Sequence, residues 1–334
     1  MFHEHQPVRI LSNAGHDWSL VLAGGEGTRL QSLTMTASGV AVPKQFCSFG
    51  GDVSLLHDAL TRSQSVTTQE RTCVVVSEHH RLWWQALDLR IPSENVIRQP
   101  RNRGTATGIL LPLLRILHRD PKANLLVLPS DHFVRNEAAL ATSLRAAMRS
   151  VRQRPDQIVI LGISPDEADP ELGYIVAEGN GVADLRSVTE FVEKPSAAVA
   201  RGLIARGGVW NSFIFAAHGA TLLRAVEERC PRLVTEMRNI VASGESPAHH
   251  DLLGHLYDHA PDLDFSRDIL QRSPSMLRVL TVPPCGWSDL GTPKRLIEAL
   301  NHVLPKSEHS LRELGRHTPF VDLTQHRSPK YAAG

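Results

Sequence analysis

Residues 18–30 read Trp-Ser-Leu-Val-Leu-Ala-Gly-Gly-Glu-Gly-Thr-Arg-Leu, an apolar run that leads straight into a glycine-rich segment. Residues 18–23 have the length and composition of a buried β-strand. Glycines directly after a strand allow the backbone to approach a phosphate closely and to aim its N–H groups at the anion. The stretch therefore predicts a phosphate-binding loop at the end of a buried strand.

Two familiar phosphate-binding patterns do not fit this loop. The G-x-x-x-x-G-K-[ST] pattern needs Lys and then Ser or Thr after its last Gly, whereas Thr28 and Arg29 follow Gly27. The G-x-G-x-x-G pattern, started at Gly25, meets Leu30 in place of its last Gly. A tight strand-to-helix turn without a ligand is an alternative for the glycines alone. Arg29 favours the anion, because a guanidinium beside such a loop suits bidentate phosphate binding.

Short apolar runs alternate with helical patterns through the first half of the chain. The strand candidates are residues 18–23, 72–77, 125–129 and 157–163, and the helix candidates are residues 54–65, 108–118 and 137–152. This alternation predicts an α/β fold with a central mixed, mainly parallel sheet flanked by helices. In such a sheet, ligands bind outside the carboxyl ends of the strands.

Beyond Gly173 the elements become shorter and extend the sheet. The candidates are strands over residues 174–177, 187–193, 209–216 and 276–282, and helices over residues 219–229, 232–243 and 292–302. Residues 247–264 are polar and rich in His and Asp, and we expect a loop that carries a short helix. The pairs His79-His80 and His249-His250 lack metal-site spacing and are expected on the surface.

The composition is that of an ordinary globular enzyme. The chain has 334 residues, of which 42% are apolar and 21% are charged. Its formal net charge is +1, so the overall charge does not indicate binding to nucleic acid or to an anionic membrane. Its four cysteines form no C-x-x-C pair. The first 17 residues lack an apolar signal core, and no apolar run is long enough to span a membrane. A cytoplasmic protein is the expectation.

The glycine loop opens a series of motifs that together resemble the sugar-1-phosphate nucleotidyltransferase family. Leu22-Ala23-Gly24-Gly25-x-Gly27-Thr28-Arg29-Leu30 is followed by Pro43-Lys44-Gln45-Phe46, a form typical of the mannose-1-phosphate guanylyltransferase branch. The later motifs, in family order, are Arg103-x-Thr105-Ala106, Leu128-Pro129-Ser130-Asp131-His132, Gly173-Tyr174-Ile175, Phe191-Val192-Glu193-Lys194-Pro195, Trp210-Asn211-Ser212 and Trp287-Ser288-Asp289-Leu290-Gly291. The resemblance covers roughly residues 18–300 and implies a Rossmann-like nucleotidyltransferase fold.

The resemblance also assigns roles. Arg29 matches the residue that holds the triphosphate and stabilises the leaving pyrophosphate, Lys44 its companion near the α-phosphate, and Lys194 the cation that binds the sugar phosphate. The other nucleotide-binding positions are Leu22, Ala23, Gly24, Gly25, Gly27, Thr28, Arg103, Thr105 and Ser130. The other sugar-binding positions are Gly173, Glu193 and Asn211. With Asp131 and Asp289, the residues Arg29, Lys44 and Lys194 form the implied catalytic set.

Asp131 and Asp289 are the candidate metal ligands. Each follows an apolar stretch, where a carboxylate is costly to bury without a partner. Mg²⁺ is typically bound by one or two carboxylates together with substrate phosphate oxygens, and the resemblance places Mg²⁺ on these two aspartates. For either aspartate taken alone, a helix N-cap is the alternative.

The implied catalytic domain spans residues 18–302, between a polar N-terminal extension (1–17) and a short C-terminal tail (303–334). Its substrates would be a nucleoside triphosphate and a sugar-1-phosphate, with GTP and mannose-1-phosphate giving GDP-mannose and pyrophosphate. No nucleic acid or membrane partner is expected, and a homodimer stays open.

Several departures from the family pattern keep other readings open. Gln31-Ser32 replaces a usual Trp-Pro pair, Gly104 replaces an Asn, and Phe213 replaces a Gly. The loop over residues 33–42 is longer than usual and is expected to form a mobile cover over the triphosphate. Another sugar or nucleotide is therefore one alternative, and a catalytically silent nucleotide-sugar sensor is another.

Overall fold

The computed structural model describes residues 15–27, 33–36, 39–48, 53–179, 184–244 and 246–301. Most of the expected N-terminal extension and the whole of the expected C-terminal tail lie outside these residues, as do Thr28 and Arg29 of the glycine loop. The first strand begins at the buried Asp17.

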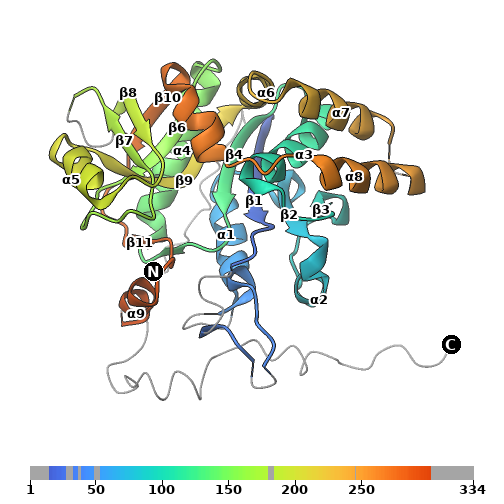
Figure 1. The fold of residues 1–334 in the computed structure, drawn as a ribbon, viewed down its shortest axis with the longest axis horizontal. Coiled ribbons are helices and arrows are strands. Elements are labelled where there is room, and N and C mark those ends of the chain that lie inside the picture. Colours follow the sequence, from blue (N-terminus) through green and yellow to red (C-terminus); the bar gives the residue numbers. More distant parts are fainter. Residues whose placement is uncertain are drawn as a thin grey trace, which may run out of the picture.

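A nine-stranded sheet is the centre of the described part of the chain (Figure 1), in the order β3-β2-β1-β4-β9-β6-β10-β8-β7. Its strands are β1 (Asp17–Ala23), β2 (Thr72–Ser77), β3 (Val96–Gln99), β4 (Asn124–Pro129), β6 (Ile158–Ile163), β7 (Tyr174–Ala177), β8 (Leu185–Val192), β9 (Val209–His218) and β10 (Leu277–Thr281). The pairings orient seven of these nine strands in one direction, and β8 and β9 run against them. The prediction of a mixed, mainly parallel sheet is confirmed.

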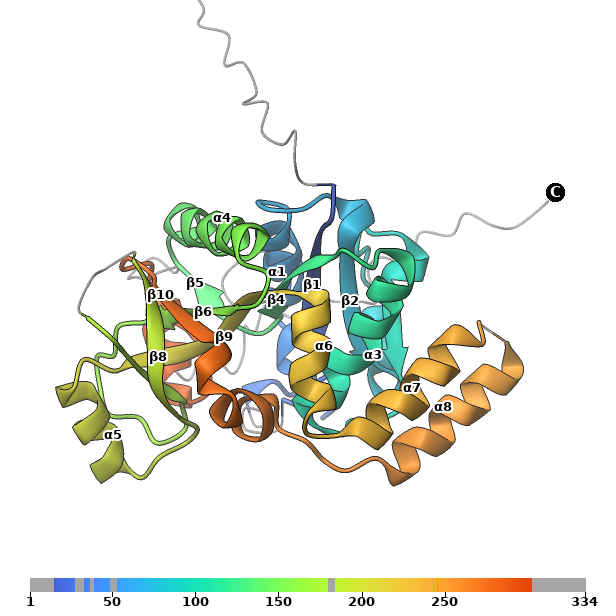
Figure 2. The same cartoon turned by 90° about the horizontal axis from the view of Figure 1, so that it is seen from above.

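Helices cover both faces of the sheet (Figure 2). One face carries α1 (Leu55–Ser63) and α4 (Glu137–Gln153), and the other carries α3 (Gly104–Arg119), α6 (Gly219–Glu227) and α7 (Pro231–Ala242). The remaining helices are α2 (Arg81–Trp84), α5 (Ala197–Ala205), α8 (Pro247–His259) and α9 (Pro293–Asn301). None of the helices described here is both long and apolar enough to span a lipid bilayer.

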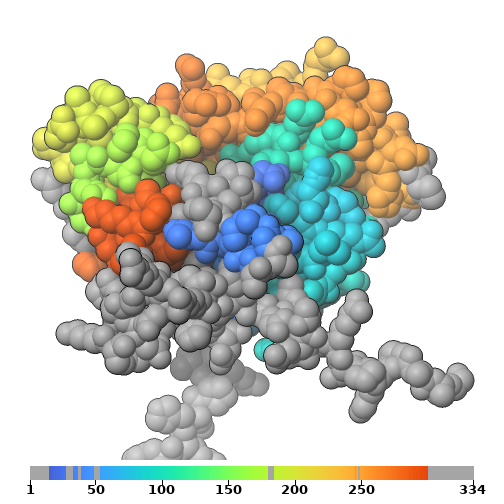
Figure 3. Space-filling view, turned by 60° about the horizontal axis from the view of Figure 1, so that its bottom comes forward, coloured from blue at the N-terminus to red at the C-terminus, as the bar shows by residue number. Residues whose placement is uncertain are grey.

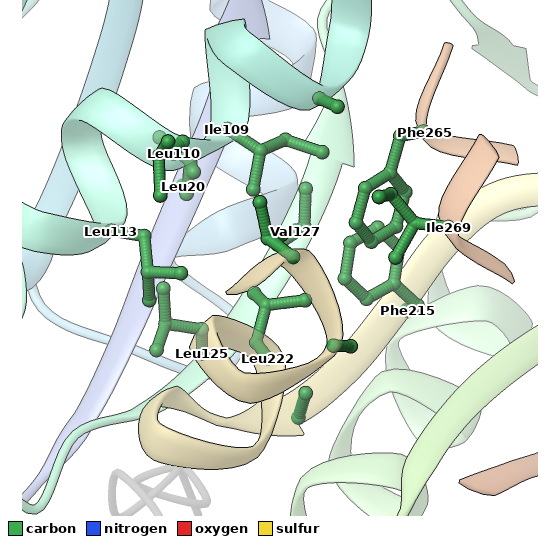
Figure 4. Close-up of a cluster of buried hydrophobic side chains, with 14 of the residues drawn as sticks. Leu20, Ile109, Leu110, Leu113, Leu125, Val127, Phe215, Leu222, Phe265 and Ile269 are labelled. Carbon is green, nitrogen blue, oxygen red and sulfur yellow. The ribbon is translucent and has the colours of Figure 1, made fainter. Parts of the chain in front are cut away.

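Strand β1 shows why continuous apolar runs form the sheet. Leu20 packs into the core on the α3 side, shown in Figure 4, whereas its neighbour Val21 packs into the core on the α1 and α4 side. Successive side chains of a strand point to opposite faces, so a strand buried on both faces needs apolar residues throughout. Because β1, β2, β3 and β4 pair in parallel, their carboxyl ends meet at one edge of the sheet.

The expectation of a loop with a short helix over residues 247–264 is wrong for most of this segment. Residues 247–259 form the regular helix α8, which begins with Pro247 after the N-cap Ser246, and whose buried Leu253 and Tyr257 join the core. Packing of these apolar side chains outweighs the polar composition. The surface placement of the histidine pairs is also wrong for one member of each, because His80 and His249 are only 7% and 2% exposed.

Candidate active site

The glycine loop leaves the carboxyl end of β1 and is held by the Pro-Lys-Gln-Phe motif. Gln45 Nε2 donates hydrogen bonds to the carbonyl oxygens of Ala23, at 3.0 Å, and Gly25, at 2.9 Å. Gly27 has a φ of +61°, and a Cβ there would lie 3.0 Å from the backbone nitrogen of Lys44. The loop and the short 3-10 turn Lys44–Phe46 therefore pack as one unit. Gln45 belongs to the Pro-Lys-Gln-Phe motif, but it is not one of the site residues that the sequence predicts.

Polar groups at the ends of neighbouring strands surround this loop. The buried Ser130 donates its hydroxyl to the carbonyl oxygen of Leu22 at 2.6 Å, and Gln99 Nε2 lies 3.4 Å from that of Gly24. Gln99 is only 2% exposed, and its Oε1, like Ser77 Oγ, has no partner among the described residues. Buried polar atoms are normally paired, so these two are suited to bind a ligand. The sequence reasoning missed Gln99, because its four-residue strand carries too little periodicity to be recognised.

Lys44 is the centre of a buried charged cluster. Its Nζ lies 2.9 Å from Asp131 Oδ2, and it donates to the carbonyl oxygens of Asp289, at 2.5 Å, and Leu290, at 3.4 Å. In the face shown in Figure 3, red-orange C-terminal residues lie beside the blue N-terminal ones, in keeping with these contacts. The structure thus brings together three predicted catalytic residues that are distant in the sequence.

Asp131 lies two residues beyond the end of β4 and is followed by the short strand β5 (Phe133–Val134) rather than by a helix, so the capping alternative does not apply to it. Burial opposes ionisation of the Asp131 carboxyl, but the ammonium of Lys44 outweighs it and holds the pKa below its ordinary value. Trp287 Nε1 donates to His132 Nδ1 at 3.2 Å, which leaves the ring proton on Nε2, 3.8 Å from Asp131 Oδ1. Burial lowers the pKa of His132 to about 4, so the ring is neutral at pH 7.

Asp289 forms a tight turn with the start of the last helix segment. Its Oδ1 accepts hydrogen bonds from the backbone N–H of Gly291, at 3.0 Å, and from Arg295 Nη1, at 2.7 Å. Leu290, between Asp289 and Gly291, has a left-handed backbone with a φ of +49°. Burial raises the pKa of Asp289, but nearby groups that include Arg295 outweigh it and hold the pKa below its usual value. Asp289 therefore stays ionised inside the protein.

Arg295, on α9, is a site residue that sequence reasoning missed. The residue is 7% exposed, and its Nη2 lies 2.5 Å from Asp169 Oδ2. Its guanidinium carbon lies 5.1 Å from the ring centroid of Trp210, in cation–π range. Arg295 thus links Asp289 to the residue before Asn211. No motif includes position 295, so nothing in the sequence distinguishes it from an ordinary helix surface cation.

The predicted sugar-binding residues form a second cluster. The backbone N–H of Asn211 donates to the carbonyl oxygen of Gly173 at 2.8 Å, and a Cβ on Gly173 would lie 2.4 Å from Glu193 Oε2. Any larger residue at position 173 would force the Glu193 carboxylate to move. Glu193 Oε2 is buried without a hydrogen-bond partner among the described residues. Lys194 is exposed beside it and has a left-handed backbone, with a φ of +48°.

Arg103 and Thr105, predicted to frame the nucleotide, also make protein contacts. Arg103 Nε and Nη2 donate to the carbonyl oxygens of Tyr257, at 2.6 Å, and Asp258, at 2.8 Å, near the end of α8. Thr105 Oγ1 accepts from the backbone N–H of Phe265 at 2.8 Å. These side chains tie the start of α3 to the segment after α8, and their contact with a nucleotide stays a prediction.

Comparison with known proteins places this site in a family. The family model described as nucleotidyl transferase matches residues 18–306, and the chain belongs to that family. The xanthan biosynthesis protein XanB of Xanthomonas campestris is 30% identical over 84% of this chain and 58% of its own length. A mannose-1-phosphate guanylyltransferase of Escherichia coli is 28% identical over 86% of this chain and 60% of its own length. The chain therefore spans about three fifths of these relatives.

A solved structure agrees with the family assignment. The Thermus thermophilus protein titled mannose-1-phosphate geranyltransferase superimposes with a TM-score of 0.65 at 26% identity, covering 83% of this chain and 76% of its own. The implied nucleotidyltransferase fold is confirmed.

Proposed function

We propose that the chain transfers a nucleotidyl group from GTP to mannose-1-phosphate and so forms GDP-mannose and pyrophosphate. The observation that carries the proposal is the convergence of Lys44, Asp131 and Asp289 beside the glycine loop. The names of relatives support the choice of GTP and mannose-1-phosphate.

The residues suit a reaction between two anions. A sugar phosphate oxygen attacks the α-phosphate, and pyrophosphate leaves in line, so catalysis consists mainly of positioning and charge neutralisation. Lys44 is fixed by three acceptors and presents its charge from a buried position. Arg29 is proposed to hold the triphosphate, but it lies outside the described residues. Lys194 is exposed and is proposed to bind the sugar phosphate.

The two aspartates fit a Mg²⁺ ion. The Asp131 side chain is 35% exposed, and Asp289 Oδ2 accepts no hydrogen bond from any residue described here, so each carboxylate can offer an oxygen. Among those residues no group of three or more His, Cys, Asp or Glu side chains is arranged to hold a metal, but two carboxylates with phosphate oxygens suffice for Mg²⁺. When bound, Mg²⁺ would neutralise the phosphates and orient them.

Another sugar-1-phosphate is the second candidate, and Phe213 is the observation that favours it. Phe213 has a φ of +58°, a left-handed conformation that glycine adopts readily and a bulky residue rarely does. Its ring packs edge-on against Phe215 and Phe265, each with centroids 6.2 Å away. A large ring therefore follows Asn211 by two residues, at a position where the family pattern has no side chain, and the Phe213 backbone N–H donates to Asn211 Oδ1 at 3.0 Å.

The test is a panel of nucleoside triphosphates against sugar-1-phosphates with Mg²⁺, with pyrophosphate release as the readout. Turnover of GTP with mannose-1-phosphate at the highest kcat/KM is the expected result. Preference for another pair would correct the specificity, and no turnover with any pair would overturn the enzyme assignment.

A further inference from the structure

A single turn of π-helix, Phe265–Ile269, lies between α8 and β10 and carries Ser266 into the sugar cluster. Ser266 is 1% exposed, and its Oγ accepts a hydrogen bond from Asn211 Nδ2 at 3.2 Å. The same hydroxyl favours the ionised form of the Glu193 carboxyl and so lowers its pKa. A serine hydroxyl that accepts from Asn211 keeps one proton to donate, and a carboxylate is a suitable acceptor for it. π-Helical turns inside proteins are frequent at functional sites.

The residue before Ser266 is fixed to the predicted nucleotide motif. Phe265 donates its backbone N–H to Thr105 Oγ1 at 2.8 Å, and the N–H of Ala106 donates to the carbonyl oxygen of Leu263 at 3.0 Å. The Phe265 ring stacks on Phe215 with centroids 5.0 Å apart. Phe265 therefore contacts the predicted nucleotide motif, and the next residue, Ser266, contacts the sugar cluster.

Glu193 has one oxygen left for a ligand. Its Oε2 is buried without a partner among the described residues, opposite Gly173, and the Ser266 hydroxyl lowers the pKa of the carboxyl group. Leaving such an atom unpaired is costly unless a ligand donates to it. Ser266 thus orients both Asn211 and Glu193 while leaving Glu193 Oε2 for a donor such as a sugar hydroxyl.

We propose that Ser266 is a positioning residue for the sugar-1-phosphate, which acts through Asn211 and Glu193. Its neighbour Phe265, bound to Thr105, sets the position of this sugar cluster relative to the nucleotide. This inference rests on the proposed function and extends it to a residue outside every motif of the sequence.

The pH profile gives the proposal a readout that a structural role would not move. Burial and the nearby Asp264 raise the pKa of Glu193 to about 7. Lys194, Arg267 and Ser266 lower this pKa, but their effect is smaller. An ionised carboxylate is the stronger acceptor for a hydroxyl, so KM for the sugar-1-phosphate falls as pH rises through about 7. Removing the Ser266 hydroxyl raises the pKa further and moves this inflection to higher pH.

The experiment compares wild type with Ser266→Ala and Ser266→Cys. Cysteine has a size similar to serine but is a weak hydrogen-bond donor and acceptor. Both variants therefore lose the hydrogen bonding of the hydroxyl, whereas only alanine also leaves a gap in the packing. We expect KM for mannose-1-phosphate to rise about tenfold at pH 7, the ratio that one hydrogen bond of ordinary strength represents. We also expect KM for GTP to stay unchanged and the inflection to move to higher pH in both variants.

Ser273→Ala is the matched control, because Ser273 is a buried serine of the same segment whose hydroxyl has no partner among the described residues. It should leave both KM values and the pH inflection at their wild-type values. An unmoved inflection, or equal rises of both KM values in Ser266→Ala, would overturn the positioning role. Wild type without turnover on any substrate pair would instead overturn the proposed function, so the two failures are distinguishable.

Discussion

Replacing Arg295 by Met should destabilise the protein strongly. The substitution keeps an unbranched, apolar side chain that can pack against Trp210 but removes the guanidinium. Asp289 and Asp169, both nearly buried, then lose the cation 2.7 Å and 2.5 Å away, respectively. Breaking a buried ion pair by removing one partner leaves an uncompensated charge and costs about 3–5 kcal/mol.

The loss should depend on pH with a definite sign. The folded pKa of Asp289 lies below its ordinary value, so its ion pair contributes stability above the unfolded pKa of about 3.9 and loses it as pH falls through the folded pKa. Without Arg295 the pKa of Asp289 rises. The difference in unfolding free energy between wild type and variant is therefore largest near pH 7 and shrinks toward pH 3.

Urea unfolding at pH 7 and at pH 4 measures both effects, with Lys294→Met as the control. Lys294 precedes Arg295 on α9 and pairs with Glu167 at 2.7 Å, but its side chain is largely exposed, so its removal should change stability little. Adding Asp289→Asn to Arg295→Met should cost less than the two single changes together, because the asparagine no longer needs a cation.

A loss below about 1 kcal/mol at pH 7 would refute this reasoning, because that is the range of exposed pairs. Equal losses in Arg295→Met and Lys294→Met would refute it as well, since only one of the two cations is buried.

Three further predictions concern the reaction. Arg29→Lys should lose about 2–4 kcal/mol of transition-state stabilisation, because a point cation cannot bind two phosphate oxygens as a planar fork does; near-normal kcat/KM would contradict this. Asp131→Asn and Asp289→Asn should each remove most Mg²⁺-dependent activity, and the double variant should cost less than the sum; strict additivity across a Mg²⁺ titration would exclude a shared ion. Residues 33–42 should exchange amide hydrogens more slowly with nucleotide bound, and equal exchange would make this loop mere surface.

The parts of the fold that the sequence predicts are those with continuous apolar runs. Residues 72–77 were expected as a strand and form β2 with the same bounds, because a strand buried on both faces must be apolar throughout. Helix α8 was underestimated, since its stability comes from Leu253 and Tyr257 packing on elements that are distant in the sequence. Single-sequence patterns contain no information on that partner surface.

The residues of the site also fall into those that the sequence predicts and those that it does not. Lys44, Asp131 and Asp289 were identified because family motifs contain them, and the structure places them together. Arg295 and Ser266 lie outside the motifs and make contact only once α9 and the π-helical turn are packed. A sequence pattern records spacing along the chain. Arg295, by contrast, pairs with Asp289, six positions before it, and with Asp169, 126 positions before it, and these pairs form only in the folded protein.

The charges of the described cluster also bear on the cation requirement. Its members carry two positive and three negative charges, from Lys44 and Arg295 against Asp131, Asp169 and Asp289. The adjacent His132 is neutral at pH 7 and adds none. A site with excess negative charge repels a triphosphate and a sugar phosphate unless further cations join it. In the roles proposed above, Arg29, Lys194 and Mg²⁺ would supply these cations.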